Sequence, residues 1–212
     1  MSGRGGETGG ELRPETREKI LEGALAAVAR HGLKKLGMND VSDAAGVSRG
    51  TLYRYFPGKD ELMSALVVRE KERFQRGLFE ALLAVPDAEG RLLAVIEFAV
   101  RELHTHAALQ RLRLSEAGLV LETIREQYAT IRGEVGLLIE PALAQTSPVA
   151  LGLIRADQLS DWLMRMLVSM FLIPEPDPDE MVRGFQAMYR VLTSPHAAPT
   201  GAETPVPHLE AV

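Results

Sequence analysis

Hydrophobic residues recur at intervals of three and four along most of this 212-residue chain, which is the spacing of amphipathic helices. In the first such segment, residues 14–30, the apolar positions are Ile20, Ala24, Leu25, Ala27 and Val28. No run of alternating polar and apolar residues predicts a strand. The pattern therefore predicts an all-α fold.

Breaks in this pattern set the expected helix boundaries. Gly46, Pro57 and Gly58 separate short helices, and a proline-rich stretch over residues 173–178 precedes the last helix. The expected helices cover residues 14–30, 38–45, 49–55, 59–85, 88–107, 109–117, 119–143, 149–172 and 179–192. Residues 1–13 and 194–212 are rich in glycine or proline and are expected to be disordered tails.

The formal net charge of −5 argues against a nucleic-acid partner until it is divided along the chain. Residues 1–76 carry 14 lysines and arginines against 11 aspartates and glutamates, whereas residues 77–212 carry 10 against 18. Residues 30–59 alone have a net charge of +4. This asymmetry predicts a basic contact module joined to an acidic body, with scattered surface charge as the alternative.

The chain contains no cysteine, which excludes disulfides and thiolate metal sites and is typical of a reducing cytosol. Its glycine-rich N-terminus lacks the apolar core of a secretory signal, and no uninterrupted apolar run has the length of a membrane span. We therefore expect a cytoplasmic protein that has no membrane contact and no cofactor.

Residues 37–59 contain two short helices joined by a tight turn. Val41 and Leu52 are expected to face a shared core, and Gly46 allows a turn conformation that a side chain would hinder. Ser48 is expected to cap the second of these helices, which leaves Arg49 and Tyr53 on its outer face. A helix of this size fits the major groove of DNA, with its N-terminal residues at the base edges.

The string AAGVSRGTLYRYF followed by GKDEL resembles the helix-turn-helix signature of the TetR family of bacterial transcriptional regulators. The resemblance implies a three-helix DNA-binding domain, residues 14–62, and a larger helical domain for effector binding and dimerisation, residues 63–193. It also implies a homodimer that binds a palindromic DNA operator, usually as a repressor that a small molecule releases. It assigns DNA contacts to Asn39, Arg49, Gly50, Thr51, Tyr53, Arg54, Tyr55 and Lys59.

Two positions depart from the family pattern, and several assigned contacts have alternatives. Gly37 stands where a serine or threonine usually caps the second helix, so a hydroxyl that often meets phosphate is missing. Ser42 replaces the usual alanine, and its hydroxyl, if buried, must bond back to a backbone carbonyl. The alternative to DNA contact for Arg49 is a solvated surface arginine, and for Tyr53 it is packing on the first helix. Tyr55 is expected both to stabilise the fold and to contact phosphate.

The helix near residues 157–172 is apolar around nearly its whole circumference, so a second subunit is its natural cover. The wall of a ligand pocket is the alternative. Asp161 and Arg165 are expected to pair across one turn of this helix. The predicted dimer interface consists of Trp162, Met166, Met170, Phe185, Met188 and Tyr189.

An effector pocket is expected between the helices of residues 88–172, and its default ligand is an apolar or amphipathic small molecule. The candidate lining residues, most of which would serve equally as plain core, are Phe98, Arg101, His104, Ile124, Tyr128 and Trp162. His104 and His106 point about 200° apart on a helix, so they do not predict a metal site.

Three other functions are alternatives to that of a ligand-responsive repressor. An activator or chromosome-organising protein would use the same DNA module without ligand control. An enzyme is not indicated, because there is no nucleophile–base arrangement and the glycine-rich residues 3–10 do not follow a strand. A protein-binding helical adaptor would have no use for Lys59 after the Gly-Thr-Leu-Tyr helix.

Overall fold

The computed structural model describes residues 13–174 and 177–193, and within these ranges the chain forms ten helices and no strand. The all-α prediction is therefore confirmed. The expected tails fall outside the described residues except for residue 13. The helices are α1 (Pro14–His31), α2 (Met38–Ala45), α3 (Arg49–Tyr55), α4 (Lys59–Leu83), α5 (Ala88–Thr105), α6 (Ala107–Ser115), α7 (Ala117–Leu143), α8 (Ser147–Ala150), α9 (Ala156–Leu172) and α10 (Pro178–Thr193).

One predicted helix is wrong, because residues 149–172 do not form a single element. The short helix α8 ends at Ala150, and Gly152 then adopts a left-handed conformation with φ of 72°. The backbone N–H of Arg155 donates to the Gln158 side chain, and α9 begins at Ala156. A glycine in this conformation ends a helix at little steric cost, so the chain turns here.

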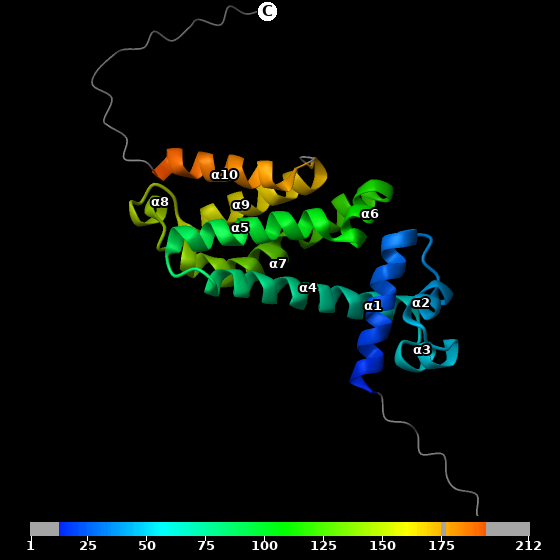
Figure 1. The fold of residues 1–212 in the computed structure, drawn as a ribbon. Helices are drawn as coiled ribbons and strands as arrows, with labels where there is room; N and C mark the ends of the chain where they lie inside the picture. The colour runs from blue at the N-terminus through cyan, green and yellow to red at the C-terminus, as the bar shows by residue number, and fades with distance from the viewer. Residues whose placement is uncertain (1–12, 175–176, 194–212) are drawn as a thin grey trace, which may run out of the picture.

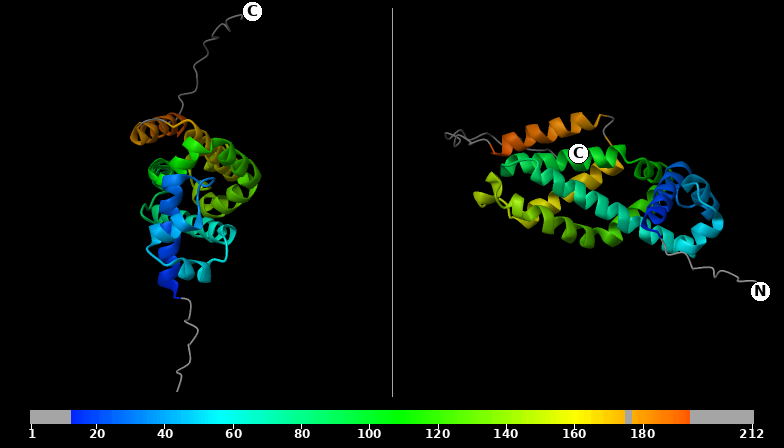
Figure 2. Two further views of the ribbon diagram at one scale, coloured as in Figure 1. Left: turned by 90° about the vertical axis from the view of Figure 1, so that its right-hand side faces the viewer. Right: turned by 60° about the horizontal axis from the view of Figure 1, so that its bottom comes forward.

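The helices form two groups, which Figure 1 and the views of Figure 2 place at opposite ends of the molecule. We call α1–α3 with the first half of α4 the N-terminal unit, and α5, α7–α10 with the second half of α4 the body. The N-terminal unit is built around Ile20, Leu21, Val41, Leu52 and Leu62. The core of the body includes Leu78, Leu92, Ile96, Leu143, Leu163 and Phe185.

Two helices connect these groups. Leu66 of α4 packs in the N-terminal core, whereas Leu78, three turns later, packs in the core of the body. The expected domain boundary after residue 62 thus falls inside a continuous helix. The second connection is α6, which packs against α1 and buries Ala108 in the N-terminal core.

Among the described helices, none combines the length and the apolar character that crossing a membrane requires.

Candidate nucleic-acid interface

The turn between α2 and α3 has the geometry that its residue types predict. Gly46 ends α2 in the left-handed conformation, with φ of 59° and ψ of 41°. The Ser48 hydroxyl accepts a 3.1 Å hydrogen bond from the backbone N–H of Thr51, so it caps α3. Val41 and Leu52 are fully buried where the two helices meet. The second helix is therefore held rigidly against the first.

Both departures from the usual pattern are resolved by local hydrogen bonds. The Asp40 carboxylate accepts a 2.8 Å hydrogen bond from the N–H of Gly37, which stabilises the start of α2 without a capping hydroxyl. Ser42 is buried, and its hydroxyl donates to the carbonyl of Asn39 at 2.9 Å, as its burial requires. Asn39 itself is exposed on the first turn of α2.

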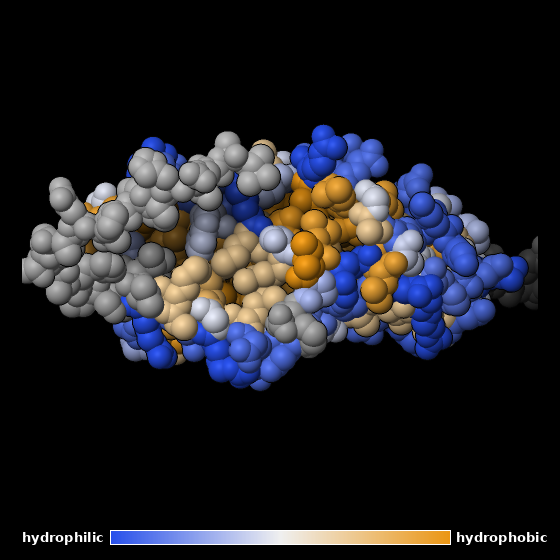
Figure 3. All heavy atoms as spheres, turned by 90° about the horizontal axis from the view of Figure 1, so that it is seen from above, coloured by the Kyte–Doolittle hydropathy of each residue, from blue (hydrophilic) through white to orange (hydrophobic). Residues whose placement is uncertain are grey.

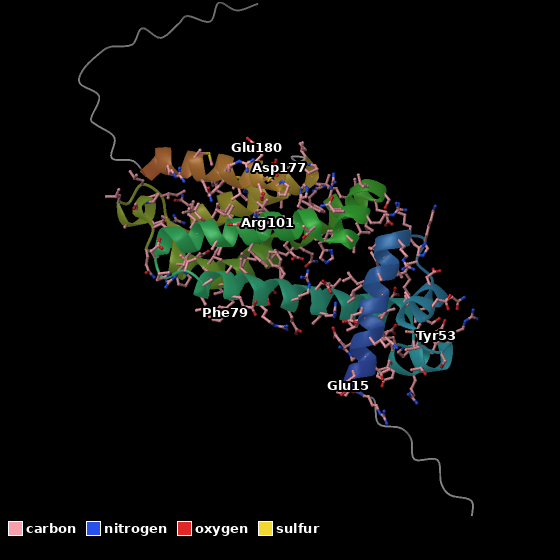
Figure 4. The ribbon with its side chains drawn as sticks, in the orientation of Figure 1. Glu15, Tyr53, Phe79, Arg101, Asp177 and Glu180 are labelled. Carbon is pink, nitrogen blue, oxygen red and sulfur yellow. The ribbon has the colours of Figure 1, made fainter. Side chains whose placement is uncertain are left out.

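The outer face of α3 is open to solvent at the end of the molecule. Arg49, Gly50, Tyr53 and Arg54 are all exposed there, and Figure 4 labels Tyr53 on this helix. Tyr53 is 49% exposed, so about half of it is accessible to a partner. Across the described part of the chain, neither Arg49 nor Tyr53 has a hydrogen bond or ion pair. The Arg49 and Tyr53 side chains are therefore available to bind another molecule.

The comparisons with known proteins agree with this geometry. The family model of bacterial regulatory proteins of the tetR family matches residues 20–66, which run from α1 into α4. A transcriptional regulator of the helix-turn-helix type from Mycobacterium tuberculosis is 26% identical over 191 residues, covering 90% of this chain and 92% of that protein. The helix-turn-helix domain of this chain is that of the TetR family. The chain is therefore a DNA-binding transcriptional regulator rather than an enzyme.

Two further comparisons show where the likeness is concentrated. The transcriptional repressor KstR of Mycolicibacterium smegmatis is 40% identical over 78 residues, which is 37% of this chain and 38% of that protein. The crystal structure of a TetR transcription regulator from Haloarcula marismortui superposes with a TM-score of 0.66 at 17% identity. It covers 85% of this chain and 98% of that one, so the TetR fold extends over the body as well.

Three of the residues that the TetR signature assigns to DNA already have side-chain partners within the chain. The Thr51 hydroxyl lies 2.9 Å from that of Ser48, whereas Lys59 and Tyr55 bind residues far away in sequence. The ammonium of Lys59 donates to the carbonyls of Leu33 and Leu36 at 2.7 and 2.9 Å, so two of its three N–H groups hold the loop between α1 and α2. The Tyr55 hydroxyl accepts from the N–H of Arg13 at 2.7 Å and donates to the Arg13 carbonyl at 3.3 Å. It fastens the start of α1 beside the end of α3. Nothing in the sequence pattern signals the Arg13 contact.

The six candidate effector residues do not converge on one pocket. Only His104 lines the cavity in the body, which measures about 20 Å³, and its imidazole has no polar partner within the described residues. The remaining lining residues of this cavity are Val100, Leu103, Gln110, Leu167, Met170, Phe171, Pro174 and Met181. Ligand pockets commonly span about 300–1,000 Å³, so this cavity is too small for a typical ligand.

The other candidates have different surroundings. Arg101 and Trp162 do not line this cavity, and both side chains are exposed. Arg101 forms ion pairs with Glu97 and Asp179 on the surface. The Phe98 ring packs on Phe74 with a centroid distance of 5.4 Å. Ile124 is half-buried on α7.

Tyr128, one turn further along α7, faces α9. Its hydroxyl donates to the Asp161 carboxylate at 3.1 Å, and burial together with this carboxylate raises the pKa of Tyr128. Arg165 pairs with the same carboxylate at 2.7 Å, which confirms the predicted pair across one turn. The tyrosine thus holds α7 to α9 through a polar contact.

The face that carries α10 and α9 is partly apolar, as Figure 3 shows. Trp162 and Met188 are 41% and 38% exposed, whereas Met166 and Met170 are partly buried against the core of the body. Phe185 is only 5% exposed and its ring lies 6.4 Å from the Trp162 ring, so its own chain covers most of it. The side chain of Tyr189 lies outside the described residues.

Proposed function

We propose that this protein is a repressor that binds a palindromic operator as a homodimer in the cytoplasm and leaves it when an apolar or amphipathic small molecule binds the body. The observation that carries the proposal is the exposed outer face of α3. Its arginines and Tyr53 are presented on a helix whose cap, turn and buried face are all fixed by the rest of the chain.

The proposed contacts have distinct tasks. Arg49 and Gly50 lie at the start of α3, where a recognition helix meets base edges, and Arg54 and Thr51 would contact phosphate oxygens. Asn39 at the start of α2 and the third N–H of Lys59 would meet phosphates beside the groove. Tyr55 would add a phosphate contact to its bond with Arg13.

Dimerisation is proposed through the apolar face of α9 and α10. Trp162 and Met188 are large and partly exposed on these helices, and Met166 and Met170 of α9 are partly buried. Covering such a face with a second copy removes apolar area from water. The pairing also places two α3 helices at one duplex, which a palindrome requires.

The effector site is proposed at the cavity beside His104. Its walls are mostly apolar and contain three flexible side chains, Leu167, Met170 and Met181, which can move apart without breaking polar contacts. The free imidazole of His104 offers one polar anchor. Because the cavity is small, effector binding would have to widen it, and this movement would be transmitted to the N-terminal unit.

The test begins with selection of duplexes from a random pool by the purified protein. Arg49→Ala and Tyr53→Ala should each weaken binding to the selected duplex by about tenfold or more, since a good base contact contributes roughly 1–3 kcal/mol. Arg125→Ala, an exposed arginine on α7, is the matched control and should bind like the parent. If both α3 variants bind as tightly as the parent, α3 is not the recognition helix.

Two further measurements address repression and release. A reporter behind the selected operator should increase its output when the gene is deleted, whereas a decrease would indicate an activator. A thermal-shift screen of apolar and amphipathic compounds should identify binders, and these should lower operator affinity in the parent but not after a cavity-filling Val100→Phe substitution.

A further inference from the structure

Glu116 is the single residue between α6 and α7, and its side chain reaches from this corner into the N-terminal unit. Its Oε1 accepts a 3.1 Å hydrogen bond from the backbone N–H of Lys34, which is 82 positions away in sequence. Lys34 belongs to the loop of residues 32–37 between α1 and α2. The corner and the loop are therefore joined by a direct bond.

The Glu116 carboxylate is buried, closely packed and only partly hydrogen-bonded, which is energetically unfavourable. Glu116 is 6% exposed, and its Oε2 is buried with no hydrogen-bond partner in the described part of the chain. A half-satisfied buried carboxylate destabilises a fold, so it is not explained by stability alone. Gly32 has a positive φ of 75°, and a Cβ at that position would clash with Oε1. The loop backbone and the carboxylate thus fit directly against each other.

The same loop is held from a second direction. The Lys59 ammonium, at the start of α4, binds the carbonyls of Leu33 and Leu36, while Glu116 binds the N–H between them. The loop leads straight into Gly37 and the first turn of α2. Its position therefore sets where α2 begins relative to α4 and to the corner.

The helix before the corner also touches the cavity. Gln110 of α6 lines the cavity, and its side-chain amide donates to the carbonyl of Leu103, another lining residue. On the other side, Ala108 and Leu112 of α6 pack in the N-terminal core. A shift of α6 at the cavity would consequently displace Glu116 and the loop that it holds.

We propose that Glu116 is a positioning residue that fixes the angle of the N-terminal unit on the body and thereby sets the spacing of the two α3 helices in the dimer. This inference rests on the proposed function, since spacing matters only when two half-sites are bound together. Glu116 itself touches no DNA in this scheme.

The experiment uses the full-length protein and the duplex that the parent selects from a random pool. Further duplexes carry the same half-sites with the intervening segment lengthened or shortened by one and two base pairs, and one duplex carries a single half-site. The parent should prefer the selected spacing. Glu116→Ala should reduce that preference by at least about fivefold, as expected for loss of a coupling contact, and bind the single half-site unchanged.

Two variants separate positioning from a general effect of substitution. Glu116→Gln keeps an oxygen acceptor for the Lys34 N–H and should restore the spacing preference. Glu126→Ala removes an exposed carboxylate from α7 and should behave like the parent.

The outcomes distinguish the two proposals. If the parent selects no duplex, the proposed function is wrong, and the positioning role that depends on it fails too. If the parent discriminates between spacings and Glu116→Ala does so equally, only the positioning role is wrong. Should Glu116→Ala not fold, hydrogen exchange in the parent decides: the Lys34 amide must exchange more slowly than that of Lys35, and equal rates overturn the proposal.

Discussion

Gly23 of α1 lies so close to Ala45 of α2 that a Cβ on Gly23 would stand 2.5 Å from the Cβ of Ala45. The Cα and backbone nitrogen of Ala45 would be only 2.6 Å away. The obstacle is mostly main chain, which cannot rotate aside as a long side chain does. The two helices therefore approach each other at a distance that only glycine permits.

Gly23→Ala should destabilise the N-terminal unit, because α1 and α2 must move apart and loosen the core around Val41. Overpacking of this kind typically costs about 1–3 kcal/mol, although alanine has the better helix propensity. Urea unfolding followed by circular dichroism measures the change, and operator affinity should fall with it. Gly133→Ala in α7 is the control: nothing lies within 4 Å of its Cβ, so this variant should be slightly more stable than the parent. Equal stability of both variants would contradict the close approach.

Lys59→Met should lower the free energy of unfolding by about 1–3 kcal/mol, since two carbonyls are deprived of a charged donor. The slope of log affinity against log salt tests the phosphate interaction separately. Removing one cationic group that binds a phosphate reduces this slope by about one, and Arg54→Ala should do so. If Lys59→Met reduces the slope by one without changing stability, the loop contact is secondary and the phosphate contact dominates.

Much of the N-terminal unit follows from local sequence rules. The left-handed Gly46, the Ser48 cap and the back-bonded Ser42 all depend on residues within four positions, where chain connectivity already restricts the geometry. The contacts of Tyr55 with Arg13 and of Glu116 with Lys34 span 42 and 82 positions. They depend on how helices dock, and a single sequence carries no periodic signal for docking.

The body illustrates the same limit. The apolar pattern correctly predicts that residues 156–172 are helical, but it does not say which chain covers their apolar side. Phe185 is buried by its own subunit, whereas Trp162 on the neighbouring helix remains partly exposed. Their different environments arise from the rotation of α10 against α5 and α9, which one sequence does not define.

Ser160→Ala should leave the protein as stable as the parent or stabilise it by up to about 1 kcal/mol. The Ser160 hydroxyl is fully buried on α9 and has no hydrogen-bond partner among the residues that the structure describes, so its desolvation is uncompensated. Thr146→Val is the matched comparison, because the buried Thr146 hydroxyl donates to the Leu143 carbonyl at 2.7 Å. That variant should lose about 1 kcal/mol. Equal losses in both variants would show that Ser160 has a partner in solution.

Glu70→Gln should make stability less sensitive to acid. Glu70 lies where α4 meets α5 and α6: its Oε2 accepts from Arg73 Nε at 2.9 Å and lies 3.1 Å from His106 Nε2. Burial raises the pKa of this carboxyl, but the hydrogen bonds from His106 and Arg73 outweigh burial and hold the pKa below its ordinary value of 4.5.

A lowered folded-state pKa means that the ionised form stabilises the fold, so this contribution is complete above pH 4.5 and disappears as the pH falls through the folded value. Urea unfolding at about pH 5 and about pH 3.5, both below the usual histidine range, should therefore show a smaller loss for Glu70→Gln than for the parent. Because the group is only partly buried, the difference should stay below about 1 kcal/mol. Glu72→Gln, on the exposed side of α4, should match the parent. An identical acid dependence in the parent and Glu70→Gln would mean that the carboxyl gains nothing from its partners on folding.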